Sequence, residues 1–327
     1  MKYINAIEFG LTNWIHDRQT WKYLSMLFAI MFVAMLIVGG IFAVLFMPII
    51  QNPETVNPIS FISSIFFAIM ILIPIAIIAG LISMYVMMLI RIRALQIAGH
   101  NPPALGWIKL IKIIILEILT GLFATFSVYR PKWLILLAAD IVLYFGGIML
   151  MGTEAMWGMI LILLSVLGFL AYFVVIIYNS LRLCFPITIF IDTEISIFDS
   201  LKKSEEITNG RVMSILGTSL VFGIIVGIIA AVIGGIIEAI VSLPFIGIFG
   251  AEPSAEVLMQ NIGILTVLLV FMLLLRTLLQ LFISVVGNFF TAGIYNLVLQ
   301  DQGTASPASN QISSTPPSEK VIRAAMK

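Results

Sequence analysis

Long apolar runs separated by short polar breaks form the main pattern of this chain of 327 residues. About 20 apolar residues are needed for a helix to cross the hydrocarbon core of a bilayer, and seven runs approach or exceed that length. We predict spanning helices at about 24–47, 59–90, 133–151, 157–178, 213–241 and 262–299. The seventh run, at 107–126, differs from these because it carries two lysines and a glutamate.

The segment 3–22 repeats apolar residues at helical spacing, with polar residues between them. Its apolar positions are Ile4, Ile7, Leu11, Trp14 and Ile15, with Trp21 near the end. A helix that carries tryptophan and adjoins a span is typical of the membrane interface. We therefore predict an interfacial helix at 3–22, and a docking surface for a partner is the alternative interpretation.

The segment 195–208 also has an apolar and a charged side when drawn as a helix. Asn209 and Gly210 follow it, and glycine suits the left-handed position that ends a helix. We predict a cytoplasmic amphipathic helix that lies on the bilayer surface.

The positions of lysine and arginine decide between six and seven spans, because cytoplasmic segments near spans are enriched in both. If 107–126 spans and the N-terminus is inside, nine of the 17 basic residues fall outside. If 107–126 stays at the inner interface, 16 fall inside, none falls outside, and Arg276 alone lies within a span. We therefore predict six spans, with 107–126 as an interfacial or re-entrant helix.

These elements predict an all-α fold, a polytopic transmembrane helical bundle with interfacial amphipathic helices. The transmembrane domain covers residues 1–300, and both termini are cytoplasmic in a multi-pass protein of the cell membrane. The last segment, 301–327, is rich in serine, proline, glutamine and threonine. Such a composition buries too little apolar surface to fold, so we expect a disordered cytoplasmic tail.

The composition indicates that lipid is the main solvent. The chain is 61% hydrophobic and 10% charged, whereas soluble domains carry roughly 25% charged residues. A net charge of +1 does not favour nucleic acid as a partner. Cys184 is the single cysteine, so an intrachain disulfide is excluded. His16 and His100 lie far apart in sequence, and we predict no metal site and no cofactor.

Ionisable groups inside a bilayer are costly and often functional, and four polar residues of the predicted spans are candidates. They are Asp140, Arg276, Gln280 and Glu238. Helical rise places Asp140 about 12 Å and Arg276 about 9 Å from the inner interface. We predict that Asp140 and Arg276 pair inside the bundle. Such a pair could line a substrate path, or it could only set the register of the helices.

Small residues recur every four positions along the fifth predicted span, at Gly223, Gly227, Ala231 and Gly235. Small side chains let helix backbones approach closely in lipid. We predict a helix-packing face here, used within the bundle or, alternatively, for homodimerisation.

Catalytic signatures are missing from the sequence. It contains no Walker phosphate loop, no His-Glu-x-x-His zinc motif and no Gly-x-Ser-x-Gly nucleophile motif. We predict no catalytic residues and expect a non-enzymatic protein, with a membrane enzyme that acts on lipid as a weaker alternative.

One stretch resembles a group of six-span membrane proteins. It contains Phe185-Pro186-Ile187, Ser200-Leu201-Lys202-Lys203-Ser204, Thr208-Asn209-Gly210-Arg211 and Ile215-Leu216-Gly217. This order is similar to the membrane domain attached to some glycerophosphoryl diester phosphodiesterases and to related archaeal and bacterial membrane proteins. The resemblance implies the six-span architecture. The phosphodiesterase activity of the fused proteins belongs to a separate soluble barrel and is not carried over to this chain.

Three predicted segments, 3–22, 107–126 and 195–208, lie at the membrane interface. We therefore expect the protein to organise lipids or partner proteins at the cytoplasmic face. Membrane lipids are the expected partners, and protein partners or a homo-oligomer are further alternatives. A transporter or channel-like carrier that uses the Asp140/Arg276 pair is the competing hypothesis.

Overall fold

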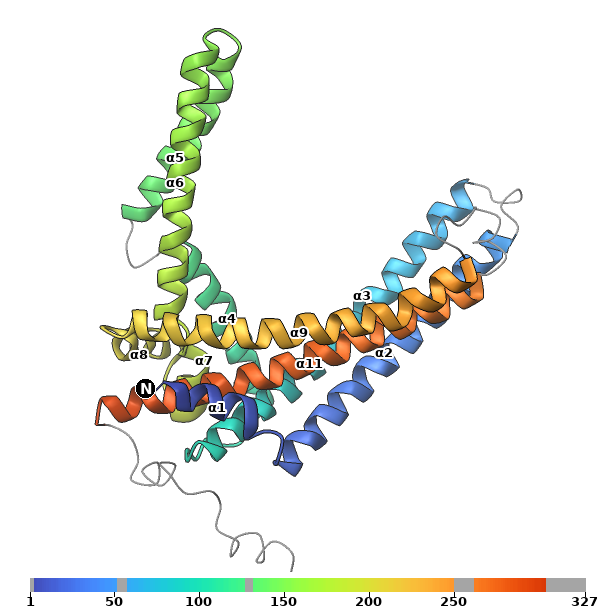
Figure 1. Ribbon diagram of the computed structural model, residues 1–327, viewed down its shortest axis with the longest axis horizontal. Coiled ribbons are helices and arrows are strands. Elements are labelled where there is room, and N and C mark those ends of the chain that lie inside the picture. Colours follow the sequence, from blue (N-terminus) through green and yellow to red (C-terminus); the bar gives the residue numbers. More distant parts are fainter. Residues whose placement is uncertain (1–2, 52–57, 127–131, 250–261, 304–327) are drawn as a thin grey trace, which may run out of the picture. The chain divides into compact units, whose positions relative to one another are not determined.

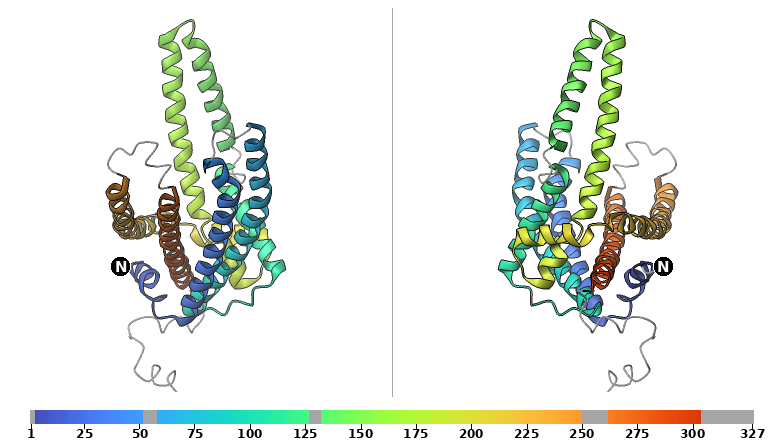
Figure 2. Two further views of the ribbon diagram at one scale, coloured as in Figure 1. Left: turned by 90° about the vertical axis from the view of Figure 1, so that its right-hand side faces the viewer. Right: turned by 90° about the vertical axis from the view of Figure 1, so that its left-hand side faces the viewer.

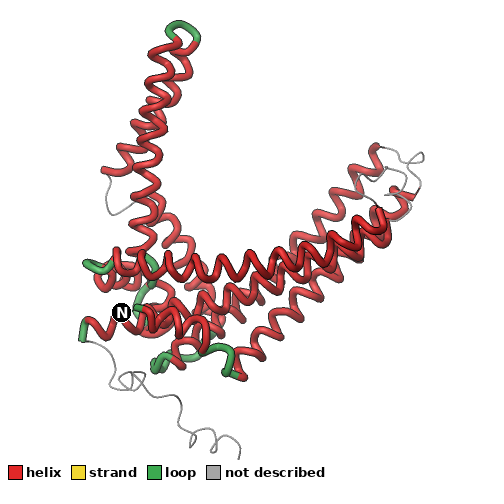
Figure 3. The backbone as a smooth tube through the Cα atoms, viewed as in Figure 1, coloured by secondary structure: helices red, strands yellow, loops and turns green. Residues whose placement is uncertain are grey.

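The computed structural model describes residues 3–51, 58–126, 132–249 and 262–303, in which every regular element is a helix (Figures 1 and 3). The helices are α1 (Ile4–Thr12), α2 (Arg18–Gln51), α3 (Pro58–Ile97), α4 (Trp107–Phe126), α5 (Lys132–Met151), α6 (Ala155–Arg182), α7 (Pro186–Thr193), α8 (Ile197–Thr208), α9 (Val212–Phe249) and α11 (Ile262–Asp301). By length and composition, six segments within them can cross a membrane. The predicted all-α fold with six membrane-spanning helices is confirmed.

The helix α4 is not among the six candidate spans. It buries Leu110, Ile113 and Leu116 against its neighbours, whereas Ile111 and Ile118 on its other side are exposed. Its predicted place at the membrane interface stays a prediction. The predicted tail, 301–327, lies outside the described residues from 304 onward.

The chain divides into two compact units. Unit 1 comprises Met1–Ile4, Ala98–Ser219 and Thr291–Lys327, and unit 2 comprises Asn5–Ile97 and Leu220–Phe290. The sequence predicted one transmembrane domain over 1–300. The helices α9 and α11 each contribute residues to both units.

In unit 2, aromatic rings join α1 and the turn that follows it to α11. The rings of Phe9 and Phe289 lie 6.0 Å apart, and those of Trp14 and Phe282 lie 5.6 Å apart. A Cβ at Gly10 would come within 2.8 Å of Cβ of Phe290, so glycine permits this close approach. The short helix α1 is therefore packed on α11 through one face.

The predicted single helix at 3–22 is instead two helices separated by a turn, and Asp17 explains the break. α1 ends at Thr12 and α2 begins at Arg18. The Asp17 carboxylate accepts a hydrogen bond of 2.9 Å from the Thr20 backbone N–H, which satisfies a free donor in the first turn of α2. The same carboxylate binds Arg93 of α3 at 2.8 Å.

In unit 1, α5 and α6 form an antiparallel hairpin whose two helices run side by side in every view (Figures 1 and 2). Gly147 lies in the last turns of α5 and Gly158 lies in the first turn of α6. A Cβ at Gly158 would lie 2.7 Å from the Met151 backbone nitrogen and 2.8 Å from the Gly147 carbonyl oxygen. Glycine is required here because the two backbones nearly touch.

The helices α7 and α8 follow the hairpin and pack on each other and on α4. Pro186 occupies the first turn of α7, where its missing N–H has no cost. The Ser196 hydroxyl caps α8 by accepting from the Asp199 N–H. α8 ends at Thr208, and Gly210 adopts a φ of 74°, as the Asn209-Gly210 pair predicts.

Candidate functional site

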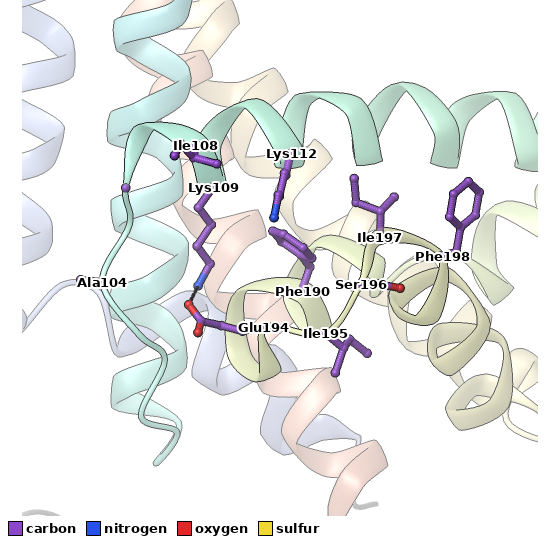
Figure 4. A pocket seen from close by; sticks show the side chains of 11 residues that line it. Ala104, Ile108, Lys109, Lys112, Phe190, Glu194, Ile195, Ser196, Ile197 and Phe198 are labelled. Carbon is purple, nitrogen blue, oxygen red and sulfur yellow. Dashed lines mark hydrogen bonds and ion pairs between the residues drawn. The ribbon is translucent and has the colours of Figure 1, made fainter.

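A pocket of about 660 Å³ lies within unit 1, between the start of α4, the end of α7 and the start of α8 (Figure 4). Its apolar wall consists of Ile108, Phe190, Ile195, Ile197 and Phe198. Its charged lining residues are Lys109, Lys112 and Glu194. The pocket thus combines an apolar wall with two ammonium groups.

The two lysines lie on one face of α4 because they are three residues apart. The Lys109 ammonium donates to the Ile191 carbonyl oxygen and to a Glu194 carboxylate oxygen, each at 3.2 Å. The Lys112 side chain is exposed and points toward Phe190 (Figure 4). Among the described residues it has no ion-pair partner. Lys112 therefore offers an uncompensated positive charge to a ligand.

Helix ends add to this positive potential. Residues in the first turns of both α4 and α8 line the pocket, and the N-terminus of a helix carries a partial positive charge. Unpaired backbone N–H groups at such an end attract anions. In α8, the carboxylate of Asp199 accepts from the Ser196 hydroxyl at 2.6 Å and offsets part of this charge. The start of α4 has no acidic residue in its first turn.

The rim of the pocket is apolar. Ile108 and Phe198 are large apolar lining residues that are exposed at the starts of α4 and α8. Exposed aromatic and aliphatic groups beside lysines are typical of a surface that meets the lipid headgroup region. The arrangement can hold an anionic group near the lysines and an apolar chain along the wall.

A part-buried polar cluster joins Asp192, near the end of α7, to His100 and Tyr295. Nδ1 of His100 lies 3.0 Å from an Asp192 carboxylate oxygen, and the Tyr295 hydroxyl donates to the same oxygen at 3.1 Å. The rings of His100 and Tyr295 are 5.4 Å apart. The sequence analysis missed this cluster, because 92 residues separate His100 from Asp192 and 103 separate Asp192 from Tyr295.

A second network attaches α8 to the end of α6. The hydroxyls of Ser204 and Thr208 both donate to the Arg182 carbonyl oxygen, at 2.9 Å and 3.1 Å. The Phe185 N–H donates to the Ser204 hydroxyl at 3.2 Å, and the Arg182 guanidinium pairs with Glu205. These contacts satisfy backbone groups that the end of α6 leaves free.

Asp140 lies inside the α5–α6 hairpin and is 4% exposed. Its carboxyl group packs against Gly168 so closely that a Cβ there would overlap it. The Ser165 hydroxyl donates to the Asp140 backbone oxygen at 3.1 Å, whereas carboxyl oxygen Oδ2 has no partner among the described residues. Gly168 was not expected to be the neighbour of this carboxyl group.

Arg276 has Glu238 as its partner in unit 2, with 3.3 Å between nitrogen and oxygen. These side chains are 56% and 66% exposed. Glu238 lies in α9, which continues to Phe249, eight residues beyond the predicted end of the fifth span at 241. Asp140 belongs to unit 1, so its predicted pair with Arg276 stays a prediction.

Gln280 lies one turn after Arg276 in α11 and is exposed. Its backbone oxygen accepts a hydrogen bond of 2.9 Å from the Ser284 hydroxyl. The predicted role of Gln280 beside an intramembrane pair stays a prediction.

The predicted packing face of α9 is open within unit 2. A Cβ at Gly223, Gly227 or Gly235 would meet no described atom within 4 Å, and Ala231 is exposed. The adjacent face makes the contact instead, since Phe222 stacks on Phe290 with ring centroids 3.7 Å apart. Successive residues of a helix point about 100° apart around its axis. Phe222 therefore faces a different direction from the stripe of small residues. A packing role for this stripe beyond the unit stays a prediction.

Within the described residues, no group of three or more histidine, cysteine, aspartate or glutamate side chains could hold a metal ion. In comparisons with known proteins, no family model, no curated protein and no solved structure matches the chain.

Proposed function

We propose that this multi-pass membrane protein is non-enzymatic and binds anionic lipid at the cytoplasmic face, where it organises lipids around unit 1. The observation that carries the proposal is the pocket with Lys109 and Lys112 beside an apolar wall. A basic residue near an anionic bilayer surface contributes about 1 kcal/mol to lipid binding. An amphiphile suits a pocket that has both charged and apolar lining.

The polar groups of the pocket favour binding over catalysis. The carboxylate of Glu194 pairs with Lys109, and the Ser196 hydroxyl is held by Asp199 in the cap of α8. Both groups are engaged in contacts that hold the pocket elements together, which is the ordinary role of an ion pair and of a helix cap.

Lipid binding to the purified full-length chain tests the proposal. In native mass spectrometry, we expect the chain to prefer phosphatidylglycerol to phosphatidylcholine carrying the same acyl chains. The double variant Lys109→Gln/Lys112→Gln should lose about 10- to 30-fold in affinity for phosphatidylglycerol, on the basis of about 1 kcal/mol per lysine.

Lys202 and Lys203 provide the matched control, because they carry the same charge on α8 and do not line the pocket. Lys202→Gln/Lys203→Gln should retain the preference for phosphatidylglycerol. Equal affinity of the wild-type chain for both lipids would reject lipid binding as the function. Equal losses in the two double variants would move the binding site away from the pocket.

The proposed topology places both termini in the cytoplasm, and it rests on the distribution of basic residues. Cysteine labelling tests it in a Cys184→Ser background. An impermeant maleimide should label Thr153→Cys in intact cells, and it should label Lys202→Cys only after permeabilisation. The opposite result would invert the topology and place the pocket outside.

A transporter or carrier is the second candidate, and it is favoured by a carboxyl oxygen of Asp140 that has no partner in the described part of the chain. Buried ionisable groups in a membrane often mark a substrate or ion path. A disulfide between Asp140→Cys and Arg276→Cys in a Cys184→Ser background would support the predicted pair. Failure to cross-link, with both single variants folded, would remove the basis of this candidate.

We also propose that the chain belongs to the six-span group that includes the membrane domain of some glycerophosphoryl diester phosphodiesterases. The residues that carry the resemblance occupy α7, α8 and the start of α9. An experimental structure of such a membrane domain should contain the same α7–α8 arrangement. A different arrangement after the fourth span would contradict the proposed membership.

A further inference from the structure

We propose that Glu194 is a built-in competitor for lipid, which occupies the anion position of the pocket until a lipid phosphate displaces it from Lys109. This inference rests on the proposed lipid-binding function. It adds that the Glu194 carboxylate, by pairing with Lys109, keeps weakly binding anions from this ammonium group.

The Lys109–Glu194 ion pair is asymmetric in exposure. The Lys109 side chain is 11% exposed and the Glu194 side chain is 59% exposed. The lysine is therefore held inside, whereas the carboxylate lies at the solvent side of the pair and has room to turn away. Exposed partners of this kind are held weakly, so a ligand anion can replace the carboxylate.

The backbone keeps Lys109 in position when Glu194 leaves. The ammonium also donates to the Ile191 carbonyl oxygen at 3.2 Å, near the end of α7. The carbonyl groups at a helix C-terminus carry partial negative charge and bind a cation. The ammonium thus has a second anchor, and a phosphate meets a donor that is already oriented.

The backbone of Glu194 is unusual for its residue type. It adopts the left-handed conformation with a φ of 55° and a ψ of 22° directly after α7. Glycine or asparagine takes this conformation at lower cost than glutamate. A glutamate at this position therefore lowers local stability. Its carboxylate faces Lys109 (Figure 4). This is consistent with a function for the side chain.

A competing carboxylate makes the pocket selective for charge. A phosphate of an anionic lipid replaces one anion by another and gains Lys112 as a further partner. The headgroup of phosphatidylcholine carries its own cation, which would lie close to both lysines. The exchange therefore favours anionic over zwitterionic lipid.

The experiment compares Glu194→Gln with Glu206→Gln in the full-length chain. Both changes remove one carboxylate, and Glu206 is exposed on α8 away from the pocket lining. Glu194→Gln should bind phosphatidylglycerol up to about fivefold more tightly, the range of an exposed ion pair. Glu206→Gln should bind like the wild-type chain. Thermal unfolding of each variant shows whether it is folded.

Inorganic phosphate at matched ionic strength distinguishes the source of the anion. It should displace phosphatidylglycerol no better than chloride does, because it makes no contact with the apolar wall. Effective displacement would assign the pocket to soluble phosphate and overturn the lipid proposal.

Two further outcomes separate this inference from the proposed function. If the wild-type chain prefers phosphatidylglycerol but folded Glu194→Gln binds it equally tightly, lipid binding stands and the competitor role is rejected. If the wild-type chain shows no preference, both are rejected. If the wild-type chain prefers phosphatidylglycerol, and Glu194→Gln but not Glu206→Gln binds it more tightly, the proposed function and the competitor role are both supported.

Discussion

Two consecutive parts of unit 1, the α5–α6 hairpin and the α7–α8 segment, are held together by different interactions. In the hairpin, small residues at the contact bring the backbones together, and large apolar side chains such as Ile135 and Met149 point outward. In α7–α8, apolar residues such as Ile189 and Leu201 are buried, and serine and threonine hydroxyls bind backbone groups.

Under the proposed topology the hairpin faces lipid and α7–α8 faces the cytoplasm, and the difference then follows from these two solvents. Lipid offers no hydrophobic driving force for helix association, so close backbone approach at small residues provides the contact. Beside water, burial of apolar surface stabilises the fold, and every buried polar group needs a partner. The pocket with Lys109 and Lys112 lies in the second kind of region, where charge and apolar surface meet.

The largest expected effect is a substitution at the hairpin contact. Gly158→Leu should lower the stability of the folded chain by about 3 kcal/mol or more, because the new side chain collides with backbone atoms of Met151 and Gly147. Thermal unfolding in detergent, followed by circular dichroism, measures the loss. Gly146→Leu is the control, since a Cβ at Gly146 meets no described atom within 4 Å. Equal effects at both glycines would contradict packing by close approach.

The second effect tests the hydroxyl network of α7–α8. Ser204→Ala should cost about 2 kcal/mol, because it leaves the buried Phe185 N–H without an acceptor. The same unfolding assay applies, with Lys202→Ala on the exposed side of α8 as the control. A loss no greater than that of Lys202→Ala would show that this segment does not depend on its polar contacts.

The third prediction tests whether polar contacts between helices also stabilise unit 2. Asp17→Ala should cost about 1–2 kcal/mol, since it removes the cap of α2 and the partner of Arg93. The matched change Glu8→Ala, at an exposed position of α1, should have little effect. If the two variants have the same free energy of unfolding, the contacts of Asp17 with Thr20 and Arg93 do not stabilise the fold.

The pH dependence of unfolding checks the same residue. Burial alone would raise the pKa of the Asp17 carboxyl, but hydrogen bonds from Arg93 and Thr20 outweigh it and lower the pKa from 3.8 to about 2. Its contribution is complete above pH 3.8 and is lost as the pH falls toward about 2. Asp17→Ala should therefore unfold with less acid dependence than the wild-type chain in this range.

The smallest effect concerns a polar contact within the hairpin. Ser165→Ala should cost about 0.6 kcal/mol, the average for a hydrogen bond between membrane helices, although the Ser165 hydroxyl is fully buried and binds the Asp140 backbone oxygen. Reversible unfolding in mixed detergent micelles measures it. A cost as large as that of Ser204→Ala would remove the contrast between the two regions.

The sequence alone predicted the six long apolar helices and their approximate places, because lipid requires a helix of sufficient apolar length at each crossing. It also predicted where α8 ends, since the Asn209-Gly210 pair provides a local signal. It did not predict the break between α1 and α2. Asp17 caps α2 through the Thr20 N–H, a local signal that the hydrophobic pattern does not reveal, and its partner Arg93 is 76 residues away.

Tertiary structure decided which residues meet. The pocket combines Lys109 with Glu194, and the part-buried cluster combines His100 with Asp192 and Tyr295, across separations that no periodicity reports. Helical periodicity fixes which residues share a face, but any two faces of similar polarity could pair. The distribution of polar groups was thus encoded locally, whereas the partner of each polar group was decided only when the helices packed.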